Sequence, residues 1–147
     1  MELFKAHQEH IHPLVTLFDQ YRQFYQRPSD IPAAESFLRD RFEKSDSVIF
    51  AAGSKSRING FIQLYPSHSS VAMKPIWILN DLFVEPSHRK KGIARQLMER
   101  AKQHAQKTGA VRIALATQVH NGAAKHLYEK LGYIQDELFH YYSLAVK

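Results

Sequence analysis

The stretch "WILNDLFVEPSHRKKGIARQLMERA" at residues 77–101 decides the fold. It opens with an apolar, strand-like run, passes through a turn rich in basic residues, and continues into a helical pattern that begins at Gly92. The apolar residues of the helical part recur at three- and four-residue spacing: Ile93, Ala94, Leu97, Met98, Ala101 and Ala105. A strand, a turn and a helix in this order are typical of proteins in which helices pack on a sheet.

The segments on either side alternate between helical and strand-like patterns. The expected helices are 11–25, 30–42 with Asp30 as its cap, and one from Asn121 closed by Gly132. In the last of these we expect four residues to face inward: Ala124, Leu127, Tyr128 and Leu131. The expected strands are 47–52 and 61–66, which form a hairpin, then 75–86, 111–117 and 139–146. The sequence therefore predicts a mixed α/β sheet with helices packed on it.

Length and composition fit one soluble globular domain of 147 residues, with 44% hydrophobic and 23% charged residues. No cysteine is present, which excludes disulfides, thiolate metal sites and a cysteine nucleophile. The N-terminus lacks the pattern of a signal peptide, and no apolar run is long enough for a membrane helix. We therefore expect a cytoplasmic protein that does not enter a membrane.

The net charge of +6 suits a nucleic acid, an acidic surface or a polyphosphate ligand. Much of the positive charge lies in one turn, at Arg89, Lys90, Lys91 and Arg95. A helix that starts after a glycine turn offers unpaired backbone N–H groups to an anion. The turn does not match the phosphate loop of nucleotide hydrolases or the G-x-G-x-x-G fingerprint of dinucleotide-binding proteins. What remains is R-x-x-G-x-A, formed by Arg89, Gly92 and Ala94.

This turn suits a pyrophosphate. Gly92 lets the backbone approach a phosphate closely, and Ala94 stays small where a ligand would pass. The backbone N–H groups of 91–95 and the side chains of Arg89, Lys90 and Lys91 would supply the donors and the charge. The alternative is a solvated basic turn at an ordinary strand-to-helix junction.

Two motifs together resemble the GNAT superfamily of N-acetyltransferases. The stretch at 77–101 looks like the family's acetyl-CoA motif, and "NGAAKHLYEKLGY" at 121–133 looks like the motif that follows it. The resemblance implies the GNAT acyl-CoA N-acyltransferase fold, a mostly antiparallel central sheet with one splayed parallel strand pair, flanked by helices. It also implies a single domain over 1–147, with an acceptor side at 1–74 and an acetyl-CoA-binding core at 75–142. Within the superfamily, the sequence looks most like the branch that acetylates diamines and polyamines.

The resemblance implies a site for acetyl-CoA as the acetyl donor and no metal. The splayed strands would be 78–85 and 111–117, with the pantetheine arm paired to the first of them and the Val84 amide pointing at the thioester oxygen. The implied cofactor-binding residues are Leu82, Phe83, Val84, Arg89, Lys90, Lys91, Gly92, Ile93, Ala94, Arg95, Asn121, Ala124 and Tyr128.

The resemblance also implies the chemistry, a direct attack of a primary amine on the thioester within a ternary complex. Tyr128 is the expected catalytic acid, because a phenol with a pKa of about 10 can protonate the departing thiolate. Tyr128 also lies on the apolar stripe of its helix, so a purely structural role is the alternative.

The sequence indicates the catalytic base less clearly than the catalytic acid. The polyamine-type enzymes tend to have a glutamate where this chain has Asn80, and asparagine does not accept a proton at neutral pH. Asp81 is adjacent, although neighbours on a strand face opposite sides. We expect a water chain near Asn80 and Asp81 to accept the proton, ahead of His68; Glu85 is a further candidate because it lies past the bulge.

The acceptor is expected to be a small primary amine; an amino acid, an aminoglycoside or a peptide amine is also compatible. The candidate pocket residues are the aromatics Tyr21, Phe24, Tyr25, Tyr65 and Trp77 and the acids Asp19, Asp30, Glu35 and Asp81. The last strand, 139–146, is a candidate for pairing across a homodimer.

Other classes of function fit the sequence less well. A non-catalytic acetyl-CoA sensor or a nucleic-acid-binding module on the same fold is the alternative to an enzyme, but no basic strand carries the interleaved aromatics that stack on bases. The histidines at 7, 10 and 12 match no zinc spacing, so we expect no metal there.

Overall fold

The computed structural model describes all 147 residues and contains one five-stranded sheet. The strands are β1 (Glu2–Lys5), β2 (Val48–Gly53), β3 (Ile58–Ser69), β4 (Lys74–Val84) and β5 (Ile113–Leu115), in that spatial order. The helices are α1 (Ile11–Phe24), α2 (Ile31–Lys44), α3 (Ile93–Lys107) and α4 (Gly122–Lys130), with single 3-10 turns η1 (Gln8–His10) and η2 (Pro86–His88). Neighbouring strands are antiparallel except β4 and β5, which are parallel. The expected mixed sheet with one parallel pair is thereby confirmed.

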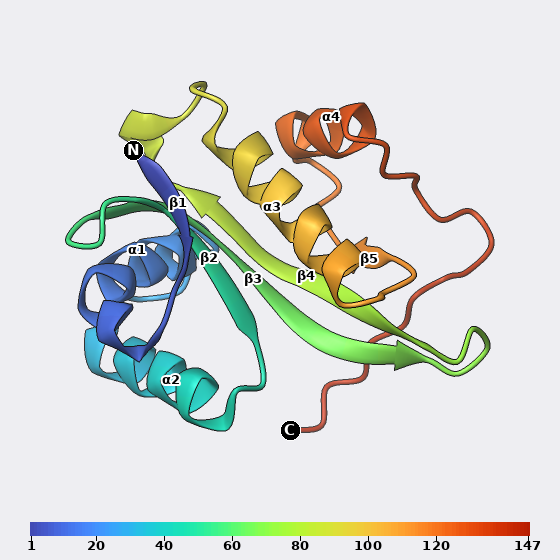
Figure 1. The fold of residues 1–147 in the computed structure, drawn as a ribbon, viewed down its shortest axis with the longest axis horizontal. Coiled ribbons are helices and arrows are strands. Elements are labelled where there is room, and N and C mark those ends of the chain that lie inside the picture. The colour runs from blue at the N-terminus through green and yellow to red at the C-terminus, as the bar shows by residue number, and fades with distance from the viewer. The chain divides into compact units, whose positions relative to one another are not determined.

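The chain divides into two compact units, Met1–Ala116 and Thr117–Lys147. The first holds the whole sheet with α1, α2 and α3, and the second holds α4 and the C-terminal segment. Within the first unit, α1 and α2 cover one face of the sheet and α3 covers the other (Figure 1). None of the helices combines the length and the apolar composition that a membrane span requires.

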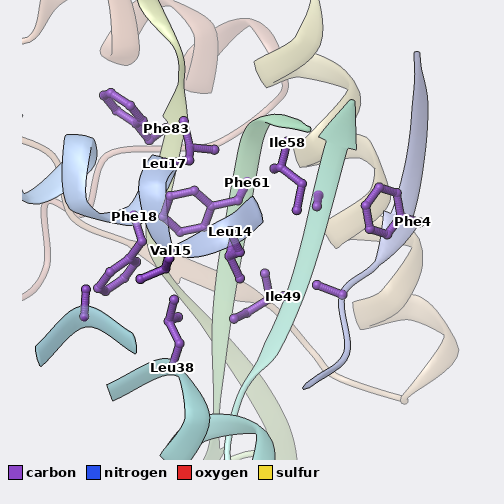
Figure 2. Packing of buried hydrophobic residues seen from close by; sticks show 13 residues of the cluster. Phe4, Leu14, Val15, Leu17, Phe18, Leu38, Ile49, Ile58, Phe61 and Phe83 are labelled. Carbon is purple, nitrogen blue, oxygen red and sulfur yellow. The ribbon is translucent and has the colours of Figure 1, made fainter. Parts of the chain in front are cut away.

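The main core lies between the sheet and the α1–α2 face. Leu14 of α1, Leu38 of α2 and Phe61 of β3 are fully buried there, and Figure 2 shows Phe61 at the centre of the cluster. Burial of each such side chain stabilises the fold by about 1.5–3 kcal/mol. Phe83 near the end of β4 belongs to the same cluster, so this end of the strand is anchored on its α1 side.

The opposite face of the sheet is shaped to receive α3. A Cβ at Gly60 of β3 would lie 3.1 Å from Ile93 and 3.3 Å from both Leu97 and Val84. The missing side chain therefore lets the first turns of α3 pack directly against the ends of β3 and β4. This packing fixes the N-terminus of α3 beside the end of β4.

Most of the expected elements are present, with small shifts at their ends. Asp30 caps α2 by accepting a hydrogen bond from the Ala33 N–H at 3.1 Å, as expected. Gly132 ends α4 with a φ of +95°, also as expected. The strand expected at 111–117 is shorter, and β1 was not predicted because four residues give too little alternation to recognise.

The expected strand at 139–146 is wrong. These residues form no strand, and their large side chains are exposed, with Tyr142 at 93%. The carboxylate of Asp136 instead accepts hydrogen bonds from the N–H groups of Leu138 and Phe139 and from the Tyr141 hydroxyl. Side-chain bonds of this kind turn the chain locally, and a β-prone sequence becomes a strand only where a neighbouring backbone pairs with it.

The inward face expected for α4 is only partly present. No residue of α4 is buried, and its apolar residues Ala124, Leu127 and Tyr128 are of intermediate exposure. The hydrophobic spacing thus predicted the helix correctly.

His104 of α3 makes the stability of the first unit depend on pH. Its ring packs 4.8 Å from Trp77 and 5.6 Å from Phe50, measured between ring centroids. Burial, followed by the charges of Lys5 and Lys107, holds the pKa of His104 below its ordinary value of 6.5. The unfolded chain therefore binds the proton more tightly, and the stabilisation is complete above pH 6.5 and lost as the pH falls below it.

We predict that the free energy of unfolding decreases between pH 7.5 and pH 5.5, and that His104→Leu reduces this decrease. Denaturant unfolding at the two pH values measures the difference. His126→Leu, at an exposed histidine, is the control and should leave the pH dependence as in the wild type. An unchanged pH dependence in His104→Leu would contradict the assignment.

Candidate active site

The site is organised by one extra residue in β4. The antiparallel register pairs Gln63 with Asp81 and Leu64 with Leu79, so Asn80 has no counterpart on β3. Such a bulge shifts the alternation of the strand by one residue. Leu79 and Asp81 consequently lie on opposite faces of the sheet although they are two residues apart. Asp81 is brought to the face covered by α1 and α2, where Phe83 also packs.

The bulge also determines which backbone groups face the outer edge of β4. The Glu85 N–H donates to the Asn59 carbonyl at 2.8 Å, and hydrogen-bonded residues alternate along an antiparallel pair. Leu82 and Val84 are therefore the residues that direct their N–H and C=O groups away from β3. The parallel pairing with β5 ends at Leu79, so no strand lies against this edge from Asn80 to Val84.

The chain after β4 is held by polar contacts. Glu85, a further candidate base, forms an ion pair with Arg57 at 2.8 Å and accepts a hydrogen bond from Asn59 at 3.1 Å. The Arg89 Nε donates to the Val84 carbonyl at 2.9 Å, and its guanidinium lies over Phe24 and Phe83. Arg89 thus occupies the Val84 carbonyl, the last backbone acceptor on the outer edge of β4.

The turn before α3 carries two residues in the left-handed region. Lys90 has a φ of +63° and Gly92 a φ of +79°. For lysine this conformation costs about 1–2 kcal/mol, and strain of this kind is concentrated at functional sites. Left-handed residues in a turn make successive backbone N–H groups converge, which forms an anion-binding concavity.

The start of α3 leaves its own donors available. Its cap, Gly92, has no side chain, and no acidic residue lies in the first turn. By contrast, Asp30 at the start of α2 and Asn121 at the start of α4 accept a hydrogen bond from a first-turn N–H. The basic side chains of Lys90, Lys91 and Arg95 are in or next to this turn, so donors and positive charge coincide there.

A buried polar chain lies on the α1–α2 face of the bulge. Asp81 is only 6% exposed, and its two carboxylate oxygens accept hydrogen bonds from the Gln63 amide at 2.8 Å and the Asn80 amide at 3.1 Å. The Ser47 hydroxyl donates to the Gln63 carbonyl oxygen at 2.8 Å. The expectation that Asn80 and Asp81 face opposite sides is wrong, because the bulge brings their side chains together.

Tyr65 lies near this chain. Burial raises the pKa of Tyr65 to about 12, and the negative charge of Asp81 acts in the same direction. Its hydroxyl therefore stays protonated at neutral pH.

The other acidic candidates for binding a cation are already engaged. Asp19 is buried, and burial alone would raise its pKa; the bonds from Ser29 and the Asp30 N–H, with Arg22 and Gln23, outweigh this and hold the pKa below its ordinary value. Asp30 caps α2. Glu35 lies 3.8 Å from Arg39 in an exposed ion pair. Asp81 has no ion pair.

The aromatic residues proposed for the acceptor pocket lie in different parts of the structure. Tyr21 packs against the main core, while Trp77 donates to the Thr108 hydroxyl at 2.8 Å on the α3 side of the sheet. Tyr65 is the member near Asp81. His68 is exposed and lies five residues beyond Gln63 along β3, a separation of about 17 Å at 3.4 Å per residue.

In the second unit, Asn121 and Tyr128 lie on the same helix. Asn121 caps α4 by accepting a hydrogen bond from the Ala124 N–H at 3.1 Å, which uses its carbonyl oxygen. Tyr128 packs its ring 6.1 Å from that of Tyr133. The local motif at 121–133 therefore has a structural role within the unit, besides any role in chemistry.

The sequence reasoning missed Gln63 and Ser47. The available signal was a glutamine inside the apolar strand "FIQLYP" at 61–66. A polar side chain in such a run has to be bonded when it is buried.

Comparison with known proteins identifies the family. Residues 14–133 match the model of the acetyltransferase (GNAT) family. The chain is 47% identical over 133 residues to the uncharacterized N-acetyltransferase YhfO of Bacillus subtilis (strain 168). The aligned region covers 90% of this chain and 89% of that protein.

Solved structures agree in fold. A probable acetyltransferase matches 100% of this chain and 99% of its own with a TM-score of 0.95 and 39% identity. The aminoglycoside N-acetyltransferase AAC(6')-Iy, solved in complex with CoA, matches 97% of this chain and 93% of its own with a TM-score of 0.82 and 20% identity. With its parallel β4–β5 pair and the unpaired outer edge of β4 beyond it, the chain belongs to the acetyltransferase (GNAT) family and is an acetyltransferase.

Proposed function

We propose that the protein transfers the acetyl group of acetyl-CoA to a primary amine of a small molecule, by direct attack within a ternary complex. The observation that carries this proposal is the open edge of β4, where Leu82 and Val84 offer backbone groups that no strand uses. This edge leads to the strained, basic turn at the start of α3. A strand edge followed by an anion site suits a ligand with an amide-containing arm and a pyrophosphate.

The residues present fit acetyl-CoA as co-substrate. In the proposal, Leu82, Phe83 and Val84 bind the pantetheine arm as an added half-strand, with the Val84 N–H directed at the thioester oxygen. The turn binds the pyrophosphate through the backbone of 91–95, with charge from Arg89, Lys90 and Lys91. Asn121, Ala124 and Tyr128 enter the proposal through their sequence motif. The CoA complex of AAC(6')-Iy, which has the same fold, supports this choice of co-substrate.

The proposed reaction forms a bond between the amine nitrogen and the acetyl carbon and breaks the bond from that carbon to sulfur. An alkylamine with a pKa of about 10.4 is mostly protonated at neutral pH, so a proton has to leave before or during attack. We assign its removal to Asp81, through a water held near Asn80. Tyr128 donates its hydroxyl proton to the departing thiolate.

The acceptor in this proposal is a small cationic amine. Asp81 is a nearly buried carboxylate with no ion pair, on the face of the bulge opposite α3. An uncompensated carboxylate in such a place favours a cation beside it. The single domain over 1–147, the homodimer, the cytoplasmic location and the polyamine branch stay predictions from the sequence.

We predict that wild-type protein releases CoA from acetyl-CoA in the presence of one class of primary amine, and that Tyr128→Phe lowers kcat at least tenfold. General acid catalysis contributes about 10²- to 10⁴-fold, and phenylalanine keeps the ring while it removes the proton donor. A thiol-release assay over monoamines, diamines, aminoglycosides and short peptides measures both. Undiminished turnover in Tyr128→Phe would remove Tyr128 from the chemistry.

We also predict that the double variant Lys91→Gln, Arg95→Gln raises the KM for acetyl-CoA about tenfold, with kcat changed less than twofold. Loss of about 1.4 kcal/mol of binding corresponds to a factor of ten, which is modest for two contacts to a charged group. Lys102→Gln, on an exposed position of the same helix, is the matched control and should leave the KM unchanged. Equal KM values in all three proteins would contradict a pyrophosphate site in this turn.

A further inference from the structure

Gln63 is the most deeply buried polar side chain of the chain. It lies in the middle of β3, is 0% exposed, and follows Phe61 and Ile62, which are also fully buried. A buried amide requires hydrogen bonds at both ends, because an unsatisfied polar group costs about 1–3 kcal/mol. An apolar residue at this position would pack without that requirement, so the amide needs an explanation beyond stability.

The hydrogen bonds of Gln63 have a fixed direction. The Gln63 amide NH₂ donates to the Asp81 carboxylate at 2.8 Å, and the Gln63 carbonyl oxygen faces Ser47. The Ser47 hydroxyl donates to that oxygen at 2.8 Å. With both ends bonded, the amide has one orientation, and the first carboxylate oxygen of Asp81 is held in place across the two strands.

The second oxygen of Asp81 is held from within the bulge. Asn80 Nδ2 donates to it at 3.1 Å. Arg41 and Asp46, two charged groups near Tyr65, form their own ion pair at 2.8 Å. Asp81 forms no ion pair, and the hydrogen bonds to its carboxylate come from the neutral amides of Gln63 and Asn80.

We propose that Gln63 is a positioning residue, which holds the Asp81 carboxylate in the orientation that accepts the amine proton, with Ser47 as the group that fixes Gln63. This inference rests on the proposed role of Asp81. Gln63 acts through Asp81 and does not contact the reacting atoms. An amide suits the task because it donates to the carboxylate without adding a charge that would repel a cationic acceptor.

The test is a double-mutant cycle between Gln63→Met and Asp81→Asn, read by steady-state kinetics with acetyl-CoA and the amine that the wild type uses. Methionine is unbranched and similar in size to glutamine, and it lacks the amide. We expect Gln63→Met to lower kcat about tenfold with the KM for acetyl-CoA within twofold of wild type. In the Asp81→Asn background the same change should lower kcat less than twofold, because residues that act as a unit are not additive.

Asn59→Leu is the matched control. Asn59 also lies on β3 and its amide also donates across the strands to a carboxylate, that of Glu85, at 3.1 Å. It lies four residues from Gln63, away from the bulge. Loss of this bond should leave kcat within twofold of wild type.

Ser47→Ala provides a second variant in which Gln63 and Asp81 are both retained. It removes the donor to the Gln63 carbonyl oxygen, and we expect a smaller loss of kcat, about two- to fivefold, that is again absent in the Asp81→Asn background. Thermal unfolding of every variant shows whether it is folded at the assay temperature. If Gln63→Met is not folded, the Ser47→Ala cycle alone tests whether Gln63 acts through Asp81.

The outcomes separate this inference from the proposed function. A wild type without acetyl transfer to any amine would overturn the proposed function, and Asp81→Asn with wild-type kcat would overturn the role of Asp81. If Asp81→Asn has a reduced kcat while Gln63→Met keeps the wild-type kcat, the positioning role of Gln63 is overturned and the proposed function still stands. A loss in Gln63→Met that is equally large with and without the Asp81 carboxylate would also overturn this role, because it would show a structural effect independent of Asp81.

Discussion

The structure of the candidate site depends on one extra residue, Asn80, in β4. If β4 ran through Asn80 as a regular strand without the bulge, Asp81 would share the face of Leu79 on the α3 side, and the backbone groups of Leu82 and Val84 would point toward β3. With the bulge, a buried carboxylate faces the α1–α2 side, and the outer edge of the strand presents backbone groups of Leu82 and the N–H of Val84, while the Val84 carbonyl accepts from Arg89. In the proposed reaction, the bulge at Asn80 therefore has two effects. It exposes the strand edge that binds the thioester arm, and it places the Asp81 carboxylate beside the attacking amine.

The surroundings of the bulge are arranged so that both halves keep their positions. Phe83 anchors β4 in the main core, and Gly60 lets α3 pack directly on the end of the strand. The strain in the turn, at Lys90, is maintained by this packing on both sides. Donors, charge and strain therefore meet at one end of β4, while Gln63, Asn80 and Ser47 order the carboxylate a few residues earlier.

The sequence predicted the architecture because its signals are local. The helical stripe after Gly92, the cap at Asp30 and the glycine at 132 each define an element from a few neighbouring residues. The Gln63–Asp81 bond was not predictable, because it joins residues on two strands whose register depends on a bulge. The strand predicted at 139–146 was wrong for a related reason. The alternation of this segment indicates a strand, but a strand also needs a partner backbone. Here the Asp136 carboxylate accepts hydrogen bonds from the N–H groups of Leu138 and Phe139 and turns the chain instead.

We infer that the edge of β4 at Leu82 and Val84 binds acetyl-CoA. Amide hydrogen exchange of these two residues, measured by NMR with and without CoA, tests it most directly. We expect both amides to exchange rapidly in the free protein and to become protected with CoA, while the amides of Phe83 and Asp81, which face β3, stay protected throughout. Unchanged exchange at Leu82 and Val84 under saturating CoA would contradict it.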